Sequence, residues 1–303
     1  MCYRKYSDFL KEKFGEKVYK LPVKLNLTCP NRDGTCGWGG CIFCGEEGGS
    51  FENNFGSIES QLLKNKELIK RKYKAKKYIS YFQNFTNTYM PIEEFKSSIN
   101  RSLIEDVVGL SISTRPDCLG EKYLDFLEEI NKNYFVTVEL GLQTTNYHSL
   151  KKLNRGHGLS EFVDACIKLK NRGINICAHV IIGLPWDNDL DIIECAKMLN
   201  VLGVDEVKIH ALYIIKGTLL GNMYEKGEIN TISLEDYKRK VILFLRHLKD
   251  DIIVERIIGR APEENSLFCN WDTSWWKIRD DIITNMKENN YCQGDLVKGE
   301  WQW

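Results

Sequence analysis

The sequence predicts an α/β protein in which a partial (β/α)6 barrel is followed by a C-terminal α+β cap. Up to about residue 230, short strand-like apolar runs alternate with stretches of helical periodicity. Beyond that point the alternation stops. The length of 303 residues fits this division, because an α/β barrel takes roughly 200–250 residues and leaves room for one small additional unit.

Six runs rich in apolar, β-branched and aromatic residues predict the strands. They lie at Tyr19–Leu27, Lys77–Gln83, Asp106–Ser113, Tyr134–Gly141, Ile174–Gly183 and Val204–Ile214. The intervening segments are long enough to form helical crossovers between parallel strands. These helices are expected near Ser57–Lys72, Ile92–Leu103, Glu121–Asn131, Ser160–Asn171 and Leu190–Leu202. A doubly wound sheet is the alternative, and in both folds ligands bind at the carboxyl ends of the strands.

The pattern divides the chain into three parts. We assign residues 1–19 to an N-terminal helical segment, 20–230 to the barrel and 231–303 to the cap. The cap is expected to contain a helix at Ser233–Lys249 and a strand at Asp251–Ile258. Five of the seven tryptophans follow, at Trp271, Trp275, Trp276, Trp301 and Trp303. We expect most of them to pack within the fold, with stacking on a substrate as the alternative.

Composition excludes several classes of protein. The chain has 42 basic and 42 acidic residues and is 43% hydrophobic, which is not the composition of a disordered, collagen-like or small disulfide-rich protein. No apolar run approaches the roughly 20 residues that cross a bilayer, and the first fifteen residues lack the apolar core of a secretory signal. We therefore expect a cytoplasmic protein with no membrane partner, in which the eleven cysteines stay reduced.

Four of the cysteines are concentrated in one glycine-rich segment. Cys29 is followed by Cys36 and then by the pair Cys41 and Cys44, which forms a CxxC motif. Thiolates are soft ligands for zinc or for iron–sulfur clusters. All four could close a structural zinc site, although zinc modules usually have two paired knuckles. Alternatively, Cys29, Cys41 and Cys44 could hold three irons of a [4Fe–4S] cluster. The other seven cysteines are isolated and are expected to be small apolar residues or neutral thiols.

Charge is locally segregated despite the balanced total. The segment Lys64–Lys77 has eight basic residues in fourteen positions and one acid, Glu67. A solvated helix face is the usual explanation for such a run. A phosphate backbone is the other ligand that would suit it.

Several segments resemble the radical S-adenosylmethionine enzymes, or radical SAM enzymes. The segment from Cys29 to Cys44 resembles their cluster loop, with the longer first interval of a subgroup related to the elongator catalytic subunit. Further matching segments follow in order: YFQNFTNTY (Tyr81–Tyr89), STRPDCL (Ser113–Leu119), ELGLQTTNYHSLKKLNRGH (Glu139–His157), HVIIGLPWD (His179–Asp187) and KIHALYIIKGT (Lys208–Thr218). ERIIGRAP (Glu255–Pro262) extends the resemblance into the cap. The whole chain is similar to the bacterial radical SAM family that includes YhcC and YtqA.

The resemblance implies a partial barrel of the radical SAM type with a [4Fe–4S] cluster and S-adenosylmethionine as cofactors. Cys29, Cys41 and Cys44 would leave one iron open to the amino and carboxylate groups of S-adenosylmethionine. A one-electron donor such as flavodoxin or ferredoxin would reduce the cluster, and cleavage of the sulfonium would give a 5′-deoxyadenosyl radical that abstracts hydrogen. Cys36 does not match a cluster position and is expected to be dispensable. The second strand also departs from the family pattern, because Tyr81-Phe82-Gln83 replaces a Gly-Gly-Glu-type segment.

The remaining candidate site residues lie near predicted strand ends or in the cluster loop. For cofactor binding we select Phe43, Gln83, Ser113, Glu139, Gln143, Gly183 and His210. For substrate binding we select Arg115, His179 and Lys216. Arg115 could meet a carboxylate as a planar fork, and Gly183 permits a close backbone approach. The competing interpretations are an ordinary ion pair for the arginine and the glutamate, and a hydrogen-bonded core position for each histidine.

The function that the resemblance implies is radical chemistry on tRNA, with the carboxymethylaminomethyl group of a wobble uridine converted to aminomethyl. Radical chemistry on a small molecule or a protein is the first alternative. A non-catalytic, zinc-dependent RNA-binding module is the second. The presence of a reducible iron–sulfur cluster separates the two enzymes from the zinc module.

Overall fold

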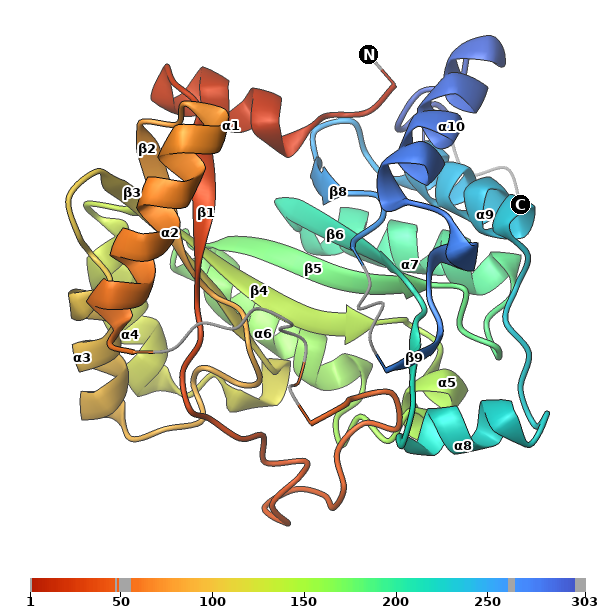
Figure 1. Cartoon of the computed structure of the whole chain (residues 1–303), viewed down its shortest axis with the longest axis horizontal. Helices are drawn as coiled ribbons and strands as arrows, with labels where there is room; N and C mark the ends of the chain where they lie inside the picture. Colours follow the sequence, from red (N-terminus) through yellow and green to blue (C-terminus); the bar gives the residue numbers. More distant parts are fainter. Residues whose placement is uncertain (1, 47, 49–55, 261–264, 298–303) are drawn as a thin grey trace.

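The computed structural model describes residues 2–46, 48, 56–260 and 265–297, and its centre is a curved sheet of seven parallel strands (Figure 1). Neighbouring strands follow the order β1-β2-β3-β4-β5-β6-β8. Their bounds are β1 Val18–Val23, β2 Lys77–Phe82, β3 Val107–Thr114, β4 Phe135–Gln143, β5 Asn175–Ile182, β6 Glu206–Ala211 and β8 Ile253–Arg256. A doubly wound sheet reverses direction at a switch point. The sequential order found here is that of a singly wound, open barrel, so the barrel prediction is confirmed.

Helices cover the convex face of this sheet. The crossovers are formed by α2 Ile58–Tyr73, α3 Ile92–Arg101, α4 Glu121–Asn131, α6 Leu159–Asn171 and α7 Asp189–Leu202. All five match the helices expected from the sequence. Local signals set their ends: the Ser57 hydroxyl accepts a hydrogen bond from the Ser60 amide at the start of α2, and Gly203 ends α7 in a left-handed conformation.

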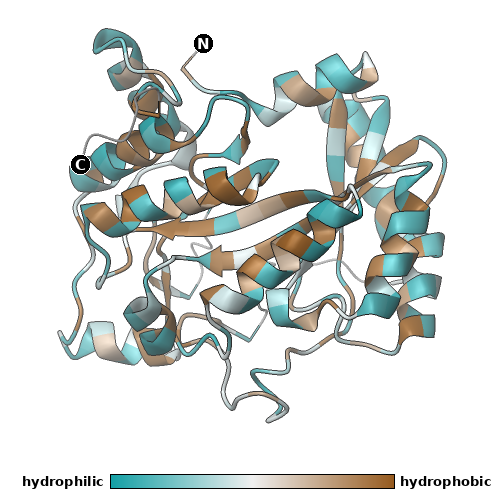
Figure 2. Ribbon diagram, turned by 180° about the vertical axis from the view of Figure 1, so that it is seen from behind, coloured by the Kyte–Doolittle hydropathy of each residue, from teal (hydrophilic) through white to brown (hydrophobic). Residues whose placement is uncertain are grey.

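The alternation of side chains along each strand separates an apolar outer layer from a polar interior. In β3, Leu110 and Ile112 belong to the hydrophobic core beneath the helices, whereas Ser111 and Ser113 bond to Glu139 inside the barrel. In β4, Val138 likewise faces the core while Glu139 faces inward. Because successive residues of a strand point to opposite faces, one apolar run supplies both layers. The outer helices also carry their hydrophilic residues on the side away from the sheet (Figure 2).

The seventh strand comes from the segment that the sequence analysis assigned to the cap. Residues Ile253–Arg256 pair in parallel with β6, so this strand extends the barrel instead of belonging to a separate layer. The N-terminal helix α1, Tyr6–Phe14, contacts both β1 and β8. The Val254 amide also donates to the Arg4 carbonyl at 2.8 Å. The two ends of the open sheet are thus bridged by the N-terminal segment (Figure 1).

The remaining elements lie at the carboxyl edge of the sheet or pack beside β8. At the carboxyl edge are α5 Tyr147–Lys152 and α8 Leu219–Glu225, together with a small antiparallel pair of β7 Ile214–Ile215 and β9 Ser266–Phe268. The other two helices are α9 Leu234–His247 and α10 Trp275–Glu288, which contact each other. Helix α9 was expected from the sequence, whereas α5, α8 and α10 were not.

Two of the three described tail tryptophans are exposed. The Trp271 indole is the exception, because it donates to the Ile232 carbonyl at 2.8 Å and packs against Tyr237. Trp275 and Trp276 are 36% and 47% exposed. Trp301 and Trp303 lie outside the described residues. Among the helices that the structure describes, none is long and apolar enough to span a membrane.

Candidate active site

One cavity at the carboxyl edge of the sheet contains three of the four clustered cysteines. Cys29, Cys41 and Cys44 all line it. They come from the long connection between β1 and α2, which begins where β1 ends. Cys36 is exposed and is not among the described residues that line the cavity. The structure therefore separates the fourth cysteine from the other three.

The backbone of this loop turns tightly around the three thiols. The Cys44 amide donates to the Cys41 carbonyl at 2.9 Å, and the Arg32 amide donates to the Cys29 carbonyl at 2.8 Å. Gly40 has a φ of +79°, and a Cβ there would lie 2.9 Å from the Arg32 side chain. A residue without a Cβ is therefore required next to Cys41.

Two arginines and an asparagine lie beside the thiols. Arg155 Nη1 lies 3.2 Å from Cys41 Sγ, and Asn31 Nδ2 lies 3.7 Å from the same sulfur. Arg115 Nη1 lies 4.0 Å from Cys29 Sγ, while its Nε and Nη2 donate to the Asp117 carboxylate. Hydrogen-bond donors beside metal-binding sulfurs tune the properties of a metal centre bound there.

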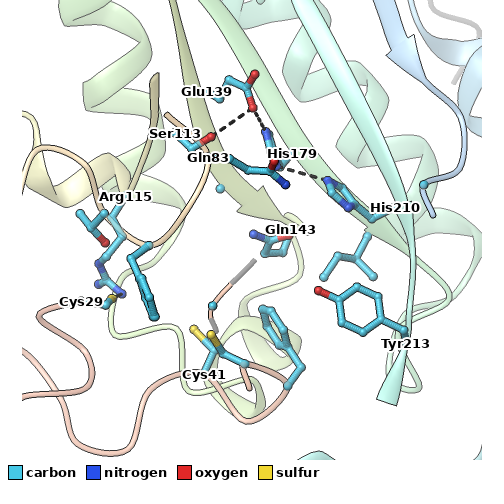
Figure 3. A pocket seen from close by; sticks show the side chains of 18 of the residues that line it. Cys29, Cys41, Gln83, Ser113, Arg115, Glu139, Gln143, His179, His210 and Tyr213 are labelled. Carbon is cyan, nitrogen blue, oxygen red and sulfur yellow. Dashed lines mark hydrogen bonds and ion pairs between the residues drawn. The ribbon is translucent and has the colours of Figure 1, made fainter. Parts of the chain in front are cut away.

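Most of the residues predicted for the site meet in this cavity. Its lining includes Phe43, Gln83, Ser113, Arg115, Glu139, Gln143, His179 and His210 in addition to the three cysteines. Figure 3 shows Glu139, Ser113 and His179 on the strands across the cavity from Cys29 and Cys41. Convergence of these residues follows from the fold, because the carboxyl ends of neighbouring parallel strands share one edge.

Two predicted residues are not brought into the cavity. Lys216 is exposed, and its backbone amide donates to the Asn265 carbonyl. Gly183 has a φ of +98°, and a Cβ there would lie 3.0 Å from Ile232 Cδ1. Neither residue is among the described residues that line the cavity. Their roles in substrate and cofactor binding stay predictions.

Glu139 is the centre of a buried charge network that the sequence did not predict. Its carboxylate accepts hydrogen bonds from Lys20 Nζ and Lys208 Nζ, both at 2.6 Å. Further donors are Ser111, Ser113, Tyr81 and His179. Burial alone would raise the pKa of Glu139, but the two ammonium groups hold it well below its usual value. Glu139 is therefore ionised and fully engaged by protein donors.

A second carboxylate balances the charge of the two lysines. Glu255 lies 2.6 Å from Lys20 Nζ and 3.1 Å from Lys208 Nζ. The neighbouring Glu206 is also completely buried, and burial together with the Glu255 charge raises its pKa well above the usual value. Of the three buried carboxyl groups, Glu206 is therefore the one that favours the protonated form. Within this network the two ammonium groups are matched by the carboxylates of Glu139 and Glu255.

The two histidines are neutral and have defined tautomers. Burial lowers the pKa of both His179 and His210. Since Glu139 is ionised, His179 donates through Nε2 at 2.6 Å, and its Nδ1 accepts from His210 Nε2 at 3.2 Å. His210 Nδ1 is then free to accept from Arg256 Nη2 at 2.9 Å. A directed hydrogen-bond chain thus runs from Arg256 to Glu139.

Comparison with family models decides the identity of the chain. The Radical SAM superfamily matches residues 32–199, and the Radical_SAM C-terminal domain matches residues 204–288. The chain belongs to the radical SAM superfamily. The resemblance found in the cysteine loop and strand ends is therefore confirmed.

Individual relatives show to which family within the radical SAM superfamily the chain belongs. It is 38% identical to YtqA of Bacillus subtilis (strain 168) over 98% of this chain and 93% of YtqA. It is 33% identical to YhcC of Escherichia coli (strain K12) over 98% of this chain and 96% of YhcC. The predicted YhcC/YtqA family is thus confirmed.

Two further matches are to longer proteins, which this chain covers only in part. A solved structure of the archaeal Methanocaldococcus infernus Elp3 has a TM-score of 0.71 at 19% identity, covering 91% of this chain and 64% of that one. It shows that the two share a fold. The tRNA uridine(34) acetyltransferase of Methanocaldococcus jannaschii is 32% identical over 142 residues, which are 45% of this chain and 25% of that protein.

Membership of the superfamily gives the cofactors as a [4Fe–4S] cluster and S-adenosylmethionine, and the residues present fit them. Three soft sulfur donors line one cavity, and the fourth clustered cysteine stands outside it. That donor set suits a cluster with one open iron better than a closed tetrahedral zinc site. Cys29, Cys41 and Cys44 would hold the cluster, which supplies the electron for reductive cleavage of the cofactor sulfonium.

Several residues of the radical SAM site escaped the sequence analysis. Lys20, Lys208 and Glu255 form the buried ion pairs, while Arg155 and Arg256 line the cavity. A signal for the first three was present, because each is a charged residue inside a predicted strand, and buried charges require partners. Arg155 and Arg256 stand in the matched segments Glu139–His157 and Glu255–Pro262, but nothing in those segments indicates that either arginine faces the cavity.

The basic run lies away from the cavity. Tyr73 ends α2 and Lys77 begins β2, so residues 70–77 are at the amino edge of the sheet. The cavity opens at the carboxyl edge. Lys66, within the run, is engaged by the Asp106 carboxylate at 2.9 Å and faces inward. The fold therefore gives the basic run no direct access to the reacting groups.

Proposed function

We propose that this radical SAM enzyme acts on the wobble uridine of tRNA and converts a carboxymethylaminomethyl side chain to an aminomethyl group. The observation that carries the choice of substrate is the likeness to a tRNA uridine(34) acetyltransferase over 142 residues. That relative is named for the same position of the same class of RNA. Elp3, with which the chain shares its fold, supports the same direction only through that shared architecture.

The cavity supports chemistry on a polar substituent. Its inner wall carries Ser113, Gln83 and the neutral imidazoles of His179 and His210, while the cysteines line another part of it. The cofactor cleavage would therefore take place a short distance from groups that can orient an amine or a carboxylate. The surrounding strands exclude bulk water from the interior, which protects a carbon radical.

The reaction follows from the chemistry of the substituent. The bound cofactors would supply the radical chemistry that removes one hydrogen atom from the methylene between the nitrogen and the carboxylate. The resulting carbon radical loses one electron, to an acceptor such as an oxidised flavodoxin or ferredoxin, and one proton, giving an imine. Water then adds to the imine and releases the two-carbon unit as glyoxylate, leaving the aminomethyl group on the uridine.

The proposal is tested by comparing the nucleosides of tRNA from cells with and without the gene. We expect carboxymethylaminomethyluridine to accumulate and aminomethyluridine to disappear in the deletion strain, with recovery by the wild-type gene and not by a Cys41→Ser variant. An unchanged wobble-uridine profile would reject the tRNA substrate.

A second measurement decides between the remaining classes of function. Anaerobically reconstituted protein that forms 5′-deoxyadenosine on reduction, but leaves the tRNA unchanged, would favour a small-molecule or protein substrate. We expect flavodoxin or ferredoxin to reduce the cluster of the purified protein. We also expect one glyoxylate to be released for each aminomethyl group formed.

A further inference from the structure

Arg256 is an arginine of the cavity with no counter-ion among the described residues. It is the last residue of β8 and lines the same cavity as the cysteines. Among the described residues, no carboxylate lies within ion-pairing distance of its guanidinium. Glu139 is the single acid in the described lining, and the two lysines already neutralise it together with Glu255. Arg155 lines the same cavity and likewise has no carboxylate partner among the described residues, so Arg256 adds to an excess of positive charge there.

The guanidinium is held in place but only partly hydrogen-bonded. Nη2 donates to His210 Nδ1 at 2.9 Å, which is the end of the chain that begins at Glu139. Nε is buried and has no acceptor. A Cβ at position 259 would lie 3.0 Å from Arg256 Cζ, so Gly259 leaves the room that the guanidinium occupies. The side chain is thus oriented, and donors remain for a ligand.

We propose that Arg256 binds a carboxylate of the substrate. A guanidinium presents two parallel N–H donors that match a carboxylate. A carboxylate also carries the single negative charge that matches one guanidinium. This inference rests on the proposed function for the identity of the group, which is the carboxylate of the carboxymethylaminomethyl substituent.

The methionine carboxylate of S-adenosylmethionine is the competing source of the same chemistry. That carboxylate would bind beside the iron that the cysteines would hold. Arg115 contacts Cys29, and Arg155 contacts Cys41. Arg256 lies instead beside His210 on β6. Tyr213 and His210 stand on the opposite side of the cavity from Cys29 and Arg115 (Figure 3). The substrate is therefore the better match for Arg256.

Two anticodon stem-loops test the proposal with the reconstituted full chain. One carries carboxymethylaminomethyluridine and the other aminomethyluridine, which lacks the carboxylate. We expect Arg256→Gln to weaken binding of the first by about 10- to 100-fold, the loss of one charge-assisted pair, and to leave binding of the second unchanged. Arg256→Lys should weaken binding of the first stem-loop to an intermediate degree, because lysine keeps the positive charge but lacks the two parallel N–H donors. The matched control is Arg101→Gln, an exposed arginine paired with Glu59.

Two measurements distinguish the carboxylate of the RNA substituent from that of S-adenosylmethionine. They are the affinity for S-adenosylmethionine and the rate at which S-adenosylmethionine is cleaved when no RNA is present. We expect both to stay within about twofold of wild type in Arg256→Gln, with normal iron content. Equal weakening of both stem-loops, or a selective loss of S-adenosylmethionine binding, would overturn the proposal.

A separate experiment tests the carboxylate site without RNA. Acetate should raise the melting temperature of the wild-type protein and acetamide should not, since only acetate carries the negative charge. Arg256→Gln should abolish the acetate effect. If neither stem-loop binds the wild type, the proposed substrate is wrong, and the acetate result still decides the role of Arg256. Equal stabilisation of wild type and Arg256→Gln by acetate would reject a carboxylate site.

Discussion

At the scale of single residues, the structure predicts which cysteines of the loop bind the cluster, and Cys36 gives the clearest test. It is exposed and contacts Arg115 Nη2 at 3.5 Å, while the other three cysteines line the cavity. We expect Cys36→Ser to retain a full cluster, whereas Cys29→Ser, Cys41→Ser and Cys44→Ser lose it. Iron and sulfide content after anaerobic reconstitution measures this. Loss of the cluster in Cys36→Ser to the same degree as in Cys41→Ser would show that the ligand assignment is wrong.

Arg155 is expected to set the reduction potential of the cluster through its contact with Cys41. Its Nη1 lies 3.2 Å from the sulfur, and Nη2 donates to the Gly141 carbonyl at 2.9 Å. Burial and Arg155 lower the pKa of His157 to about 2, so this neighbour adds no charge. A cation beside a thiolate stabilises the reduced, more negative state. Arg155→Gln should therefore lower the midpoint potential by roughly 60 mV.

The measurement for Arg155 is a redox titration followed by electron paramagnetic resonance. Arg101→Gln, far from the cysteines and exposed, is the control and should leave the potential unchanged. An unchanged or higher potential in Arg155→Gln would contradict the assignment.

At the scale of elements, the inner faces of the strands are held together by the carboxylate of Glu139. Lys20 of β1 and Lys208 of β6 both contact it, so one residue of β4 links distant strands. Removing its charge leaves two buried ammonium groups with Glu255 alone. We expect Glu139→Gln to lower the free energy of unfolding by about 3–5 kcal/mol. Urea denaturation measures the loss, and a change below about 1 kcal/mol would show that the network does not stabilise the barrel.

Glu206 has the opposite pH dependence from an ordinary carboxyl group. Its pKa in the folded protein is raised by burial and by Glu255, so the native state retains a proton that the unfolded chain releases. Stability is therefore lost as the pH rises from the unfolded pKa toward the folded one. Glu206→Gln keeps a neutral amide and removes this titration. We expect the variant to gain about 1.4 kcal/mol per pH unit relative to wild type above roughly pH 4.5.

Denaturation at several pH values between about 5 and 8 checks this difference. A constant gap between Glu206→Gln and wild type over that range would show that Glu206 is ionised in the native protein. Thr137, which donates to Glu206 Oε1 at 3.3 Å, remains a donor in both proteins.

At the scale of the whole molecule, the two edges of the barrel have separate roles. The cavity opens at the carboxyl edge, whereas the end of the basic run lies at the amino edge. We expect combined replacement of Lys70, Arg71, Lys72 and Lys74 by glutamine to leave the affinity for an anticodon stem-loop unchanged. The salt dependence of binding should also stay the same, because phosphate contacts set that slope. A clearly weaker slope would place the RNA backbone on α2.

The bridging of the two ends of the open barrel also belongs to the scale of the whole molecule. The N-terminal segment bridges β1 and β8, and β8 brings Glu255 and Arg256 to the interior. Residues more than 200 positions apart are thereby placed in one charge network. The cap segment consequently contributes directly to the cavity.

The sequence by itself determined the strands and crossover helices, the loop that holds the three cysteines and the edge of the sheet at which the site lies. Each of these depends on contiguous residues, whose periodicity records which side is buried. The tertiary structure alone decided that β8 joins the sheet, that Lys20 and Lys208 meet Glu139, and that Arg155 and Arg256 face the cavity. These pairings depend on the register and curvature that bring distant strands together, and no local pattern encodes them.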